Sequence, residues 1–341
     1  MSEIKNAKMR DSNMELLRII AMLLVMIVHT GFVSLGQPSQ HELQSSPGIT
    51  TYRFFCQSLS IICVNLFILL SGWYGIRPQK KSFLRFLFQI AFFVLGGFFI
   101  YLSITPEKAL TIESLLKLFL LLPDNWFIKA YILLYILAPF LNSFLDSATQ
   151  SQKGKFIASF FVIQSIYGWL FNGMRDFEDG YTTISFIGLY MLANYVRHSQ
   201  SQFFKLSRKV DILIYILISC ALTILSLILC ASNHSYEFLF AYNNPLVVIS
   251  SLYFFLYFTK LSLQSRIINN IATSSFAIYL LHCNPFFFRQ IYTSTVSKRF
   301  YEQPFGCWLI ATIVFIIITA TASICLDKIR ILLWAKLQKT I

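Results

Sequence analysis

The sequence has little charge: only 13% of its 341 residues are Asp, Glu, Lys or Arg, about half of the roughly 25% usual in soluble domains. This scarcity excludes a soluble globular enzyme, and the 56% hydrophobic content excludes a disordered chain. Acidic residues are scarcer than basic ones, 15 against 28, which gives a formal net charge of +13. We expect no nucleic-acid partner, because in a chain with long apolar runs a membrane orientation signal explains this excess better.

Long apolar runs, rich in the 35 Phe residues, predict an all-α polytopic membrane protein. The run 184–198 is short for a span, and the apolar stretch 111–122 is expected to be re-entrant or interfacial. The predicted organisation is a segment 1–13, a membrane domain 14–326 and a basic tail 327–341. We predict about ten transmembrane helices, over residues 14–36, 52–76, 84–104, 126–146, 156–174, 184–198, 210–231, 243–260, 267–288 and 305–326.

The distribution of Lys and Arg predicts that both termini are cytoplasmic. If the N-terminus lies inside, 19 of the 28 basic residues fall in inner segments and 8 in outer segments, and Arg18 lies within the first span. Basic residues are enriched on the cytoplasmic side of membrane proteins. The cluster of Arg77, Lys80, Lys81 and Arg85 either adds to this signal, by meeting anionic lipid headgroups, or attracts the phosphates of a ligand.

The first predicted span carries the ionisable residues Glu15, Arg18 and His29. Arg18 and His29 are 11 residues apart, about 20° from the same azimuth, so they share one helix face roughly 16 Å apart along the axis. Glu15 precedes Arg18 by three residues and is placed to pair with it. The structural alternatives are a snorkelling arginine and a hydrogen-bonded packing histidine. Because the separation fits an extended pantetheine arm of roughly 15–20 Å, we expect an anionic nucleotide at Arg18 with its thioester beside His29.

A second histidine is expected at the same depth. His282 lies about 14 residues into an outward span, so we expect His29 and His282 to flank one polar cavity, with Tyr279 one turn from His282. We expect no metal there, because no carboxylate accompanies the two histidines at that depth. The seven cysteines form no C-x-x-C pair and lie mostly in apolar runs, so we interpret them as small core or lipid-facing residues.

The spacing of Arg18 and His29 resembles the R-x10-H pattern of the acyltransferase-3 family of integral membrane acyltransferases. Further segments resemble the family in its order, over roughly residues 13–326, although Trp73 stands where the family usually has Phe or Tyr. These segments are Val64-Asn-Leu-Phe-Ile-Leu-Leu-Ser-Gly-Trp73, Trp126-Phe-Ile with Tyr131 and Pro139, Tyr242-Asn-Asn-Pro245, and Ser275-Phe-Ala-Ile-Tyr279-Leu-Leu-His282.

The resemblance implies O-acyl transfer, typically of acetyl, from cytoplasmic acyl-CoA to a hydroxyl of an extracytoplasmic polysaccharide or lipid-linked glycan. Acyl-CoA is then a co-substrate and no cofactor stays bound. The implied location is the cell membrane of a bacterium, with membrane lipid, the glycan acceptor and glycan-assembly proteins as partners. The residues expected at the site are Arg18, Glu15, Ser71 and Gly72 for the donor, His29 and His282 for catalysis, and Trp126, Tyr279 and Asn244 for the acceptor.

Several of these residues have a plain structural interpretation as well. Ser71 and Gly72 are also typical of a close helix contact, His282 of a structural hydrogen bond, and Trp126 of an interfacial anchor. The acidic segment 175–181 and Asp124 suit either carbohydrate hydroxyls or a solvated loop.

Two other functional classes compete with acyl transfer. A transporter or flippase would use Arg18 and His29 as substrate or proton-relay groups, but the sequence has no internal repeat and no Gly/Pro-interrupted pair of spans. A glycosyltransferase or polymerase of lipid-linked sugars usually needs a large acidic outer loop, and no predicted outer loop exceeds about 20 residues. Stabilisation by CoA, as opposed to a lipid diphosphate, would separate these classes.

Overall fold

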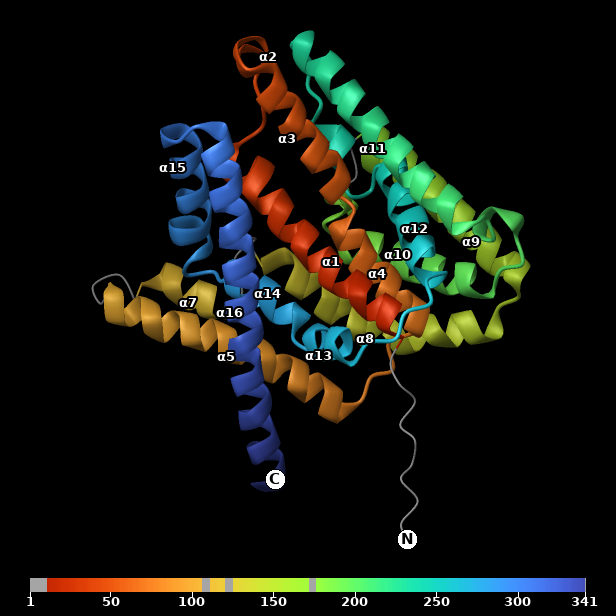
Figure 1. Cartoon of the computed structure of the whole chain (residues 1–341). Helices are drawn as coiled ribbons and strands as arrows, with labels where there is room; N and C mark the ends of the chain where they lie inside the picture. Colours follow the sequence, from red (N-terminus) through yellow and green to blue (C-terminus); the bar gives the residue numbers. More distant parts are fainter. Residues whose placement is uncertain (1–10, 106–110, 120–124, 172–175, 341) are drawn as a thin grey trace.

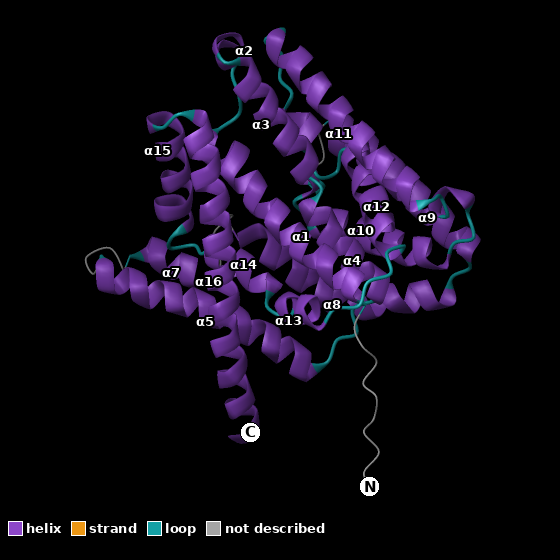
Figure 2. Ribbon diagram, viewed as in Figure 1, coloured by secondary structure: helices purple, strands orange, loops and turns teal. Residues whose placement is uncertain are grey.

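Helices and their connecting loops make up this computed structural model, which describes residues 11–105, 111–119, 125–171 and 176–340; no strand occurs among these residues (Figures 1 and 2). The prediction of an all-α protein is confirmed. In chain order the elements are α1 (Ser12–Val28), η1 (His29–Val33), α2 (Gln40–Ser45), α3 (Pro47–Ser60), α4 (Cys63–Tyr74), α5 (Lys80–Ile104), α7 (Ile112–Leu118), α8 (Trp126–Ser147), α9 (Gln150–Ile163), η3 (Gln164–Leu170), η4 (Glu178–Gly180), α10 (Thr183–His198), η5 (Gln202–Phe204), α11 (Arg208–Ala231), η6 (Glu237–Phe240), α12 (Pro245–Thr259), α13 (Arg266–Ala272), α14 (Ser275–His282), η7 (Phe288–Thr293), α15 (Ser294–Glu302) and α16 (Phe305–Thr340).

The first helix, α1, runs through the middle of the bundle (Figure 1). It packs against α3, α4, α12, α13 and α14, and its side chains Leu17, Ala21 and Met26 are fully buried. A helix that is apolar around most of its circumference is stable only when other helices surround it. The ionisable residues of α1 are therefore held inside the protein.

Seven helical segments within the described part of the chain are long and apolar enough to cross a membrane. They correspond to seven of the ten predicted spans: α1 with η1, α3 with α4, α5, α8, α11, η6 with α12, and α16. The predicted span 156–174 forms α9 and the π-helical turn η3, and the predicted span 184–198 forms α10, which has only 16 residues. The chain is thus a polytopic membrane protein.

The predicted span 267–288 is wrong as a continuous helix. The chain forms α13 and α14, turns at Cys283–Pro285 and re-enters a π-helical turn, η7. Pro285 lacks the N–H that would continue α14 and disfavours helical backbone in the residue before it. The Asn284 side chain holds this turn, because its Nδ2 donates to Phe93 O (2.9 Å) and its Oδ1 accepts from Phe286 N (3.1 Å).

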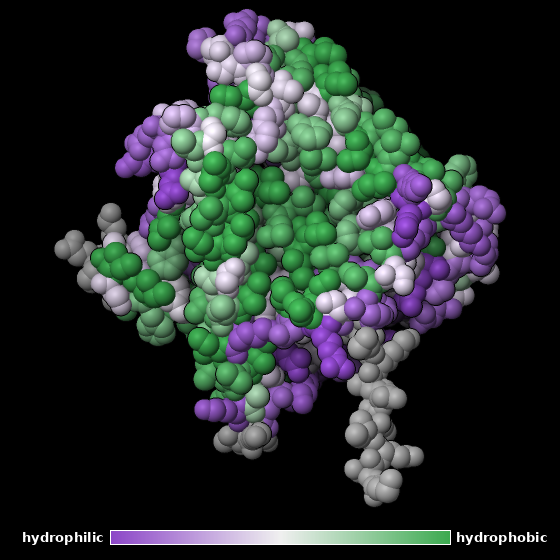
Figure 3. Space-filling view, viewed as in Figure 1, coloured by the Kyte–Doolittle hydropathy of each residue, from purple (hydrophilic) through white to green (hydrophobic). Residues whose placement is uncertain are grey.

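Hydrophobic side chains cover the middle of the visible face, and hydrophilic ones gather towards its ends (Figure 3). α16 crosses this face and buries only 17% of its most apolar stretch, whereas α3 with α4 buries 78%. Exposed apolar surface of this extent is what lipid would cover. α16 and α11 therefore lie at the periphery of the bundle, and α1 and α4 form its core.

The described ends of the chain lie at the same end of the bundle. Ser12 at the start of α1 receives a hydrogen bond from Ser265 N (2.9 Å), just before α13. Lys328 in the C-terminal half of α16 donates to Asn270 O in α13 (2.8 Å). The segment expected as a separate basic tail instead continues α16 to Thr340, while residues 1–10 of the predicted N-terminal segment lie outside the described residues.

Candidate active site

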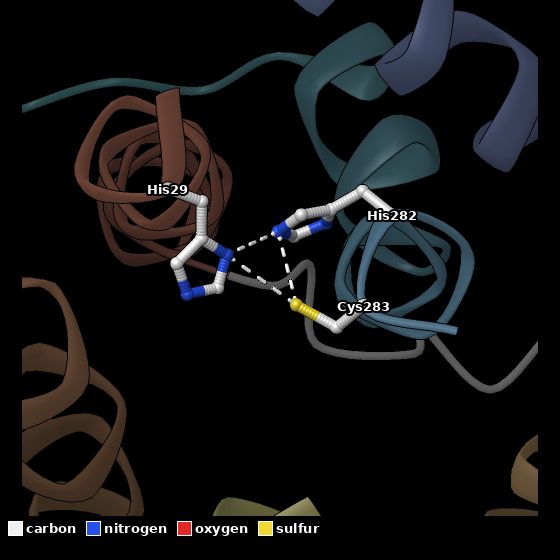
Figure 4. Close-up of side chains that lie close together, drawn as sticks. All are labelled: His29, His282 and Cys283. Carbon is white, nitrogen blue, oxygen red and sulfur yellow. Dashed lines mark hydrogen bonds between the residues drawn. The ribbon is translucent and has the colours of Figure 1, made fainter. Parts of the chain in front are cut away.

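Two helix ends meet in the interior of the bundle. α1 gives way to the π-helical turn η1 at His29, and within this turn Gly31 has non-helical backbone angles (φ −87°, ψ −110°). α14 ends at His282, before the turn at Cys283–Pro285. Local π-helical geometry is rare in proteins and concentrates at functional sites. Because α1 changes to a π-helical turn at His29 and α14 ends at His282, the side chains of the two histidines point toward each other (Figure 4).

His29, His282 and Cys283 form a close cluster (Figure 4). His29 Nδ1 lies 3.0 Å from His282 Nε2, and Cys283 Sγ lies 3.4 Å from the former and 3.2 Å from the latter. His282 is buried, whereas His29 and Cys283 are partly exposed. The two histidines lie close together, but of the two only His29 lines a cavity described below, so the prediction that both flank one polar cavity is not borne out. The interpretation of the cysteines as core or lipid-facing residues is wrong for Cys283, because the turn after α14 brings its sulfur to both histidines.

The hydrogen-bond network assigns the proton positions of the two rings. His282 Nδ1 lies 2.5 Å from Ile278 O, and a carbonyl only accepts, so this nitrogen carries a proton and donates. In the neutral ring His282 Nε2 is then an acceptor, and His29 Nδ1 donates to it. The remaining nitrogen of His29, Nε2, keeps a lone pair and lies on the side of the ring away from His282 (Figure 4).

The same cluster offers two imidazole nitrogens and one sulfur within 4.8 Å of one another, a donor set known from zinc sites. Two nitrogen ligands of one tetrahedral zinc lie roughly 3.3 Å apart, and a nitrogen and a sulfur ligand roughly 3.6 Å apart. The observed separations of 3.0, 3.2 and 3.4 Å are shorter than these and match hydrogen bonds. These separations fit hydrogen bonds, while the expectation of no metal, whose sequence-based reason overlooked Cys283, stays a prediction.

A cavity of about 1140 Å³ opens beside Arg18. Arg18 and Glu15 form an ion pair across 2.6 Å, and both line this cavity. Five cationic residues line it against two acidic ones; although the buried Asp327 compensates one of them, Arg330, the cations still outnumber the acids and the cavity favours an anionic ligand. The cations are Arg18, Arg85, Arg197, Lys328 and Arg330, and the acids are Asp11 and Glu15.

Ser71 and Gly72 differ in where they point. Ser71 lines the Arg18 cavity, and its hydroxyl lies 3.2 Å from that of Tyr131. Gly72 is instead packed against α10, where an added Cβ would lie 2.8 Å from the Cα of Tyr190. The prediction that Gly72 contacts the donor is therefore wrong. Gly72 serves helix packing instead, because only a glycine allows α4 and α10 to approach this closely.

A second cavity, of about 730 Å³, is lined by His29 and Cys283 and is rich in aromatic rings. The Trp126 and Tyr181 rings lie 4.4 Å apart, and Tyr242 lies 5.2 Å from Tyr181. Trp126 and Tyr279 line this cavity, as predicted for residues near an acceptor. Aromatic faces with polar tips bind ligands that are partly apolar and partly hydroxylated.

The two cavities adjoin, because Met22, Phe67 and Phe127 line both of them. Met22 lies on α1 between Arg18 and His29, one turn beyond Arg18. The Arg18 cavity and the aromatic cavity therefore meet along the α1 face predicted from the sequence. The two residues at the ends of this face line different cavities that share three apolar residues.

Two other predictions place residues differently from the structure. Asn244 is fully buried as the cap of α12, where its Oδ1 accepts from Leu246 N (2.9 Å) and its Nδ2 donates to Leu239 O (2.7 Å). The predicted acceptor contact of Asn244 is therefore wrong: the Asn-Pro pair starts a helix. In the acidic segment 175–181 only Tyr181 lines the aromatic cavity, while Arg175 and Asp124 lie outside the described residues.

Sequence reasoning missed several lining residues. Lys328 and Arg330 line the Arg18 cavity but lie in the segment predicted as a basic tail. Cys283 lines the aromatic cavity but is one of seven cysteines that lie mostly in apolar runs and form no C-x-x-C pair. Of the basic cluster at residues 77–85, only Arg85 reaches the Arg18 cavity. For Cys283 the sequence did contain a signal, because this residue directly follows His282, which was already expected at the site.

Comparison with known families identifies the class of protein to which this helical membrane bundle belongs. A family model described as an acyltransferase domain, that of the acyltransferase-3 family, matches residues 11–326. The chain therefore belongs to the acyltransferase-3 family and is a multi-pass membrane acyltransferase. Searches of curated proteins and of solved structures gave no match to this chain.

Proposed function

We propose that this protein transfers an acyl group, acetyl in the first instance, from cytoplasmic acyl-CoA to a hydroxyl of an extracytoplasmic or lipid-linked polysaccharide. One observation supports this proposal above the others. A cationic cavity at Arg18 and an aromatic cavity at His29 adjoin along one face of α1. The first has the chemistry of a nucleotide site and the second that of a carbohydrate site.

The Arg18 cavity suits the donor because CoA carries a diphosphate and a 3′-phosphate at one end and a thioester at the other. Guanidinium groups bind phosphates with charge-assisted, often bidentate hydrogen bonds. The axial distance from Arg18 to His29, roughly 16 Å, matches the reach of the pantetheine arm. Apart from Arg18, which lies within the first predicted span, the cations of this cavity come from the segments predicted to be cytoplasmic, which supports entry of the donor from that side.

The aromatic cavity suits the acceptor. Trp126, Tyr181 and Tyr242 line one space and pack their rings edge to face on one another. Sugar rings stack on aromatic faces through their C–H groups, while hydroxyl groups orient them. Lys117 and Arg289, which come from predicted outer segments, line the same cavity. Their position supports an acceptor that enters from the extracytoplasmic side; the membrane we propose is that of a bacterial cell, with glycan-assembly proteins delivering the acceptor.

The proposed chemistry follows from the assigned proton positions. A sugar hydroxyl is a weak nucleophile, and His29 Nε2 has the lone pair needed to accept its proton as the oxygen attacks the acyl carbonyl. His282 fixes this tautomer of His29, because its Nε2 accepts the Nδ1 proton of His29. His282 lines neither cavity, and toward the acceptor hydroxyl it acts as a positioning residue.

The test separates donor binding from transfer. CoA binding is measured on purified protein, and transfer is measured by mass spectrometry of surface glycan from a deletion strain that carries each variant. We expect His29→Ala to bind CoA like the wild type and to transfer no acyl group, while Arg18→Ala weakens CoA binding by 10-fold or more. His198→Ala is the matched control, since this histidine is exposed at the end of α10. Full glycan acylation by both His29→Ala and Arg18→Ala would overturn the proposal.

A further inference from the structure

We propose that Cys283 carries the acyl group as a thioester between the two cavities, so that transfer occurs in two steps. This inference rests on the proposed function and assigns a covalent role to a thiol that the mechanism above leaves unused. Its basis is the position of the sulfur, which lies in hydrogen-bond contact with both histidines and lines the aromatic cavity.

The surroundings of Cys283 are those of an activated nucleophile. A thiol becomes reactive when a neighbouring base takes its proton and a donor stabilises the thiolate. His282 Nε2, 3.2 Å from the sulfur, is an unprotonated acceptor because Nδ1 of the same ring donates to Ile278 O. His29 Nδ1, 3.4 Å from the sulfur, donates to His282 Nε2 in the resting cluster; when that nitrogen takes the proton of the thiol, this N–H turns to the thiolate and donates to it.

The first step exchanges one thioester for another. Cys283 gives its proton to His282, and its sulfur attacks the carbonyl of the acyl-CoA. The carbon–sulfur bond to CoA breaks, the proton passes from His282 to the departing sulfur, and CoA leaves as a thiol. One thioester forms and one breaks, so no oxidant, reductant or further reactant is needed.

The second step delivers the acyl group to the glycan. His29 Nε2 takes the proton of the acceptor hydroxyl, and the oxygen attacks the carbonyl of the Cys283 thioester. An ester forms, the bond to Cys283 breaks, and the cysteine sulfur recovers a proton from the His29–His282 pair. The two histidines thus serve different steps: His282 acts on the thiol and His29 on the hydroxyl.

The division of the interior into two cavities explains why a covalent carrier of the acyl group would be needed. Met22, Phe67 and Phe127 are common to both cavities, so the donor has to pass its acyl group beyond an apolar boundary. Cys283 lies on the aromatic side of this boundary. A thioester at Cys283 keeps the acyl group in the acceptor cavity after CoA has left, so the donor and the glycan need not be bound together.

The test looks for the intermediate itself. Purified full-length protein is incubated with radiolabelled acyl-CoA and no glycan; the acyl group is the one that the wild type transfers to glycan, with acetyl-CoA used first. We expect up to one label per chain, which neutral hydroxylamine removes and mass spectrometry locates on Cys283. Cys283→Ala should take up no label and should lose glycan acylation by 10²-fold or more while retaining CoA binding. His29→Ala should acquire label and keep it when glycan is added.

The matched controls are Cys230→Ala, another thiol in the bundle core, and Cys307→Ala, an exposed one; both should keep label and activity. An unlabelled wild type, or wild-type glycan acylation by Cys283→Ala, overturns the relay. About one zinc or other divalent metal per chain that disappears in Cys283→Ala also overturns it, because the cluster is then a metal site. In each of these cases an inactive His29→Ala that binds CoA leaves the proposed function standing, whereas full glycan acylation by both His29→Ala and Arg18→Ala overturns that function.

Discussion

His29 Nδ1 lies 3.0 Å from His282 Nε2, although 253 positions separate the two residues in the chain. The contact joins the C-terminal ends of α1 and α14, and it continues through His282 Nδ1 to the carbonyl of Ile278. In this series of hydrogen bonds, the carbonyl of Ile278 fixes the tautomer of His282, and His282 in turn determines that Nε2 of His29 keeps a lone pair. Through this contact His282 controls the tautomer of His29, so replacing His282 should affect catalysis by His29.

His282→Ala should reduce acyl transfer by roughly 10²-fold or more, because His29 loses the acceptor that fixes its tautomer. Donor affinity should stay near the wild-type value, since His282 does not line the Arg18 cavity. Initial rates at varied acyl-CoA concentration separate the two effects, and His198→Ala serves as the control. A variant with a normal rate, or with a change in donor KM alone, would contradict the assigned network.

Gly97→Ala should destabilise the protein by about 1–3 kcal/mol, because an added Cβ would lie 2.7 Å from Cγ of Asn284 and displace this side chain. Thermal unfolding in detergent measures the change in Tm. The adjacent Gly96→Ala is the matched control, because nothing lies within 4 Å of its Cβ position and alanine favours a helix. Replacing Asn284 by Ala in the Gly97→Ala background should recover part of the loss; equal Tm values for the two single glycine variants would refute the contact.

Trp126→Ala should raise the KM for the glycan acceptor by roughly 3- to 10-fold, because the acceptor loses a stacking surface beside Tyr181. CoA binding should not change, since Trp126 does not line the Arg18 cavity. Trp169→Ala is the comparison, because Trp169 donates to Phe238 O and lies outside both cavities. If Trp126 only anchors the protein at the membrane interface, both tryptophan variants will leave the acceptor KM unchanged.

Glu42→Gln should lower the Tm at neutral pH and have little effect in acid. Partial burial raises the pKa of this carboxyl, but the Ser39 N–H and the Arg53 guanidinium outweigh burial and bring the net pKa below its usual value. The ion pair, 2.7 Å long, thus stabilises the fold above the pKa that Glu42 has when unfolded. This contribution disappears as the pH falls through the lowered pKa. A Tm difference that does not shrink with acidification would contradict this assignment.

Residues on one helix could be placed from the sequence with some accuracy. Arg18 and Glu15 lie on α1 and His29 directly follows its last residue, so the helical repeat gives their relative positions without knowledge of the rest of the fold. The proximity of His282 to His29 followed from their similar depth in the membrane. Gly72 and Asn244 were placed wrongly in the site, because facing α10 and capping α12 depend on how neighbouring segments pack.

The sequence by itself determined that this chain is a helical membrane protein, that it resembles the acyltransferase-3 family, and that Arg18 and His29 share one face of the first helix. Composition and helical periodicity are local properties of the chain, so the amino-acid sequence alone is enough to establish them. Only the tertiary structure decided that the penultimate predicted span breaks at Cys283–Pro285 and brings a thiol to both histidines. It also decided that α16 contributes Lys328 and Arg330 to the Arg18 cavity. These contacts join segments far apart in sequence, and they depend on packing choices, such as the space that Gly97 leaves for Asn284, which no local pattern records.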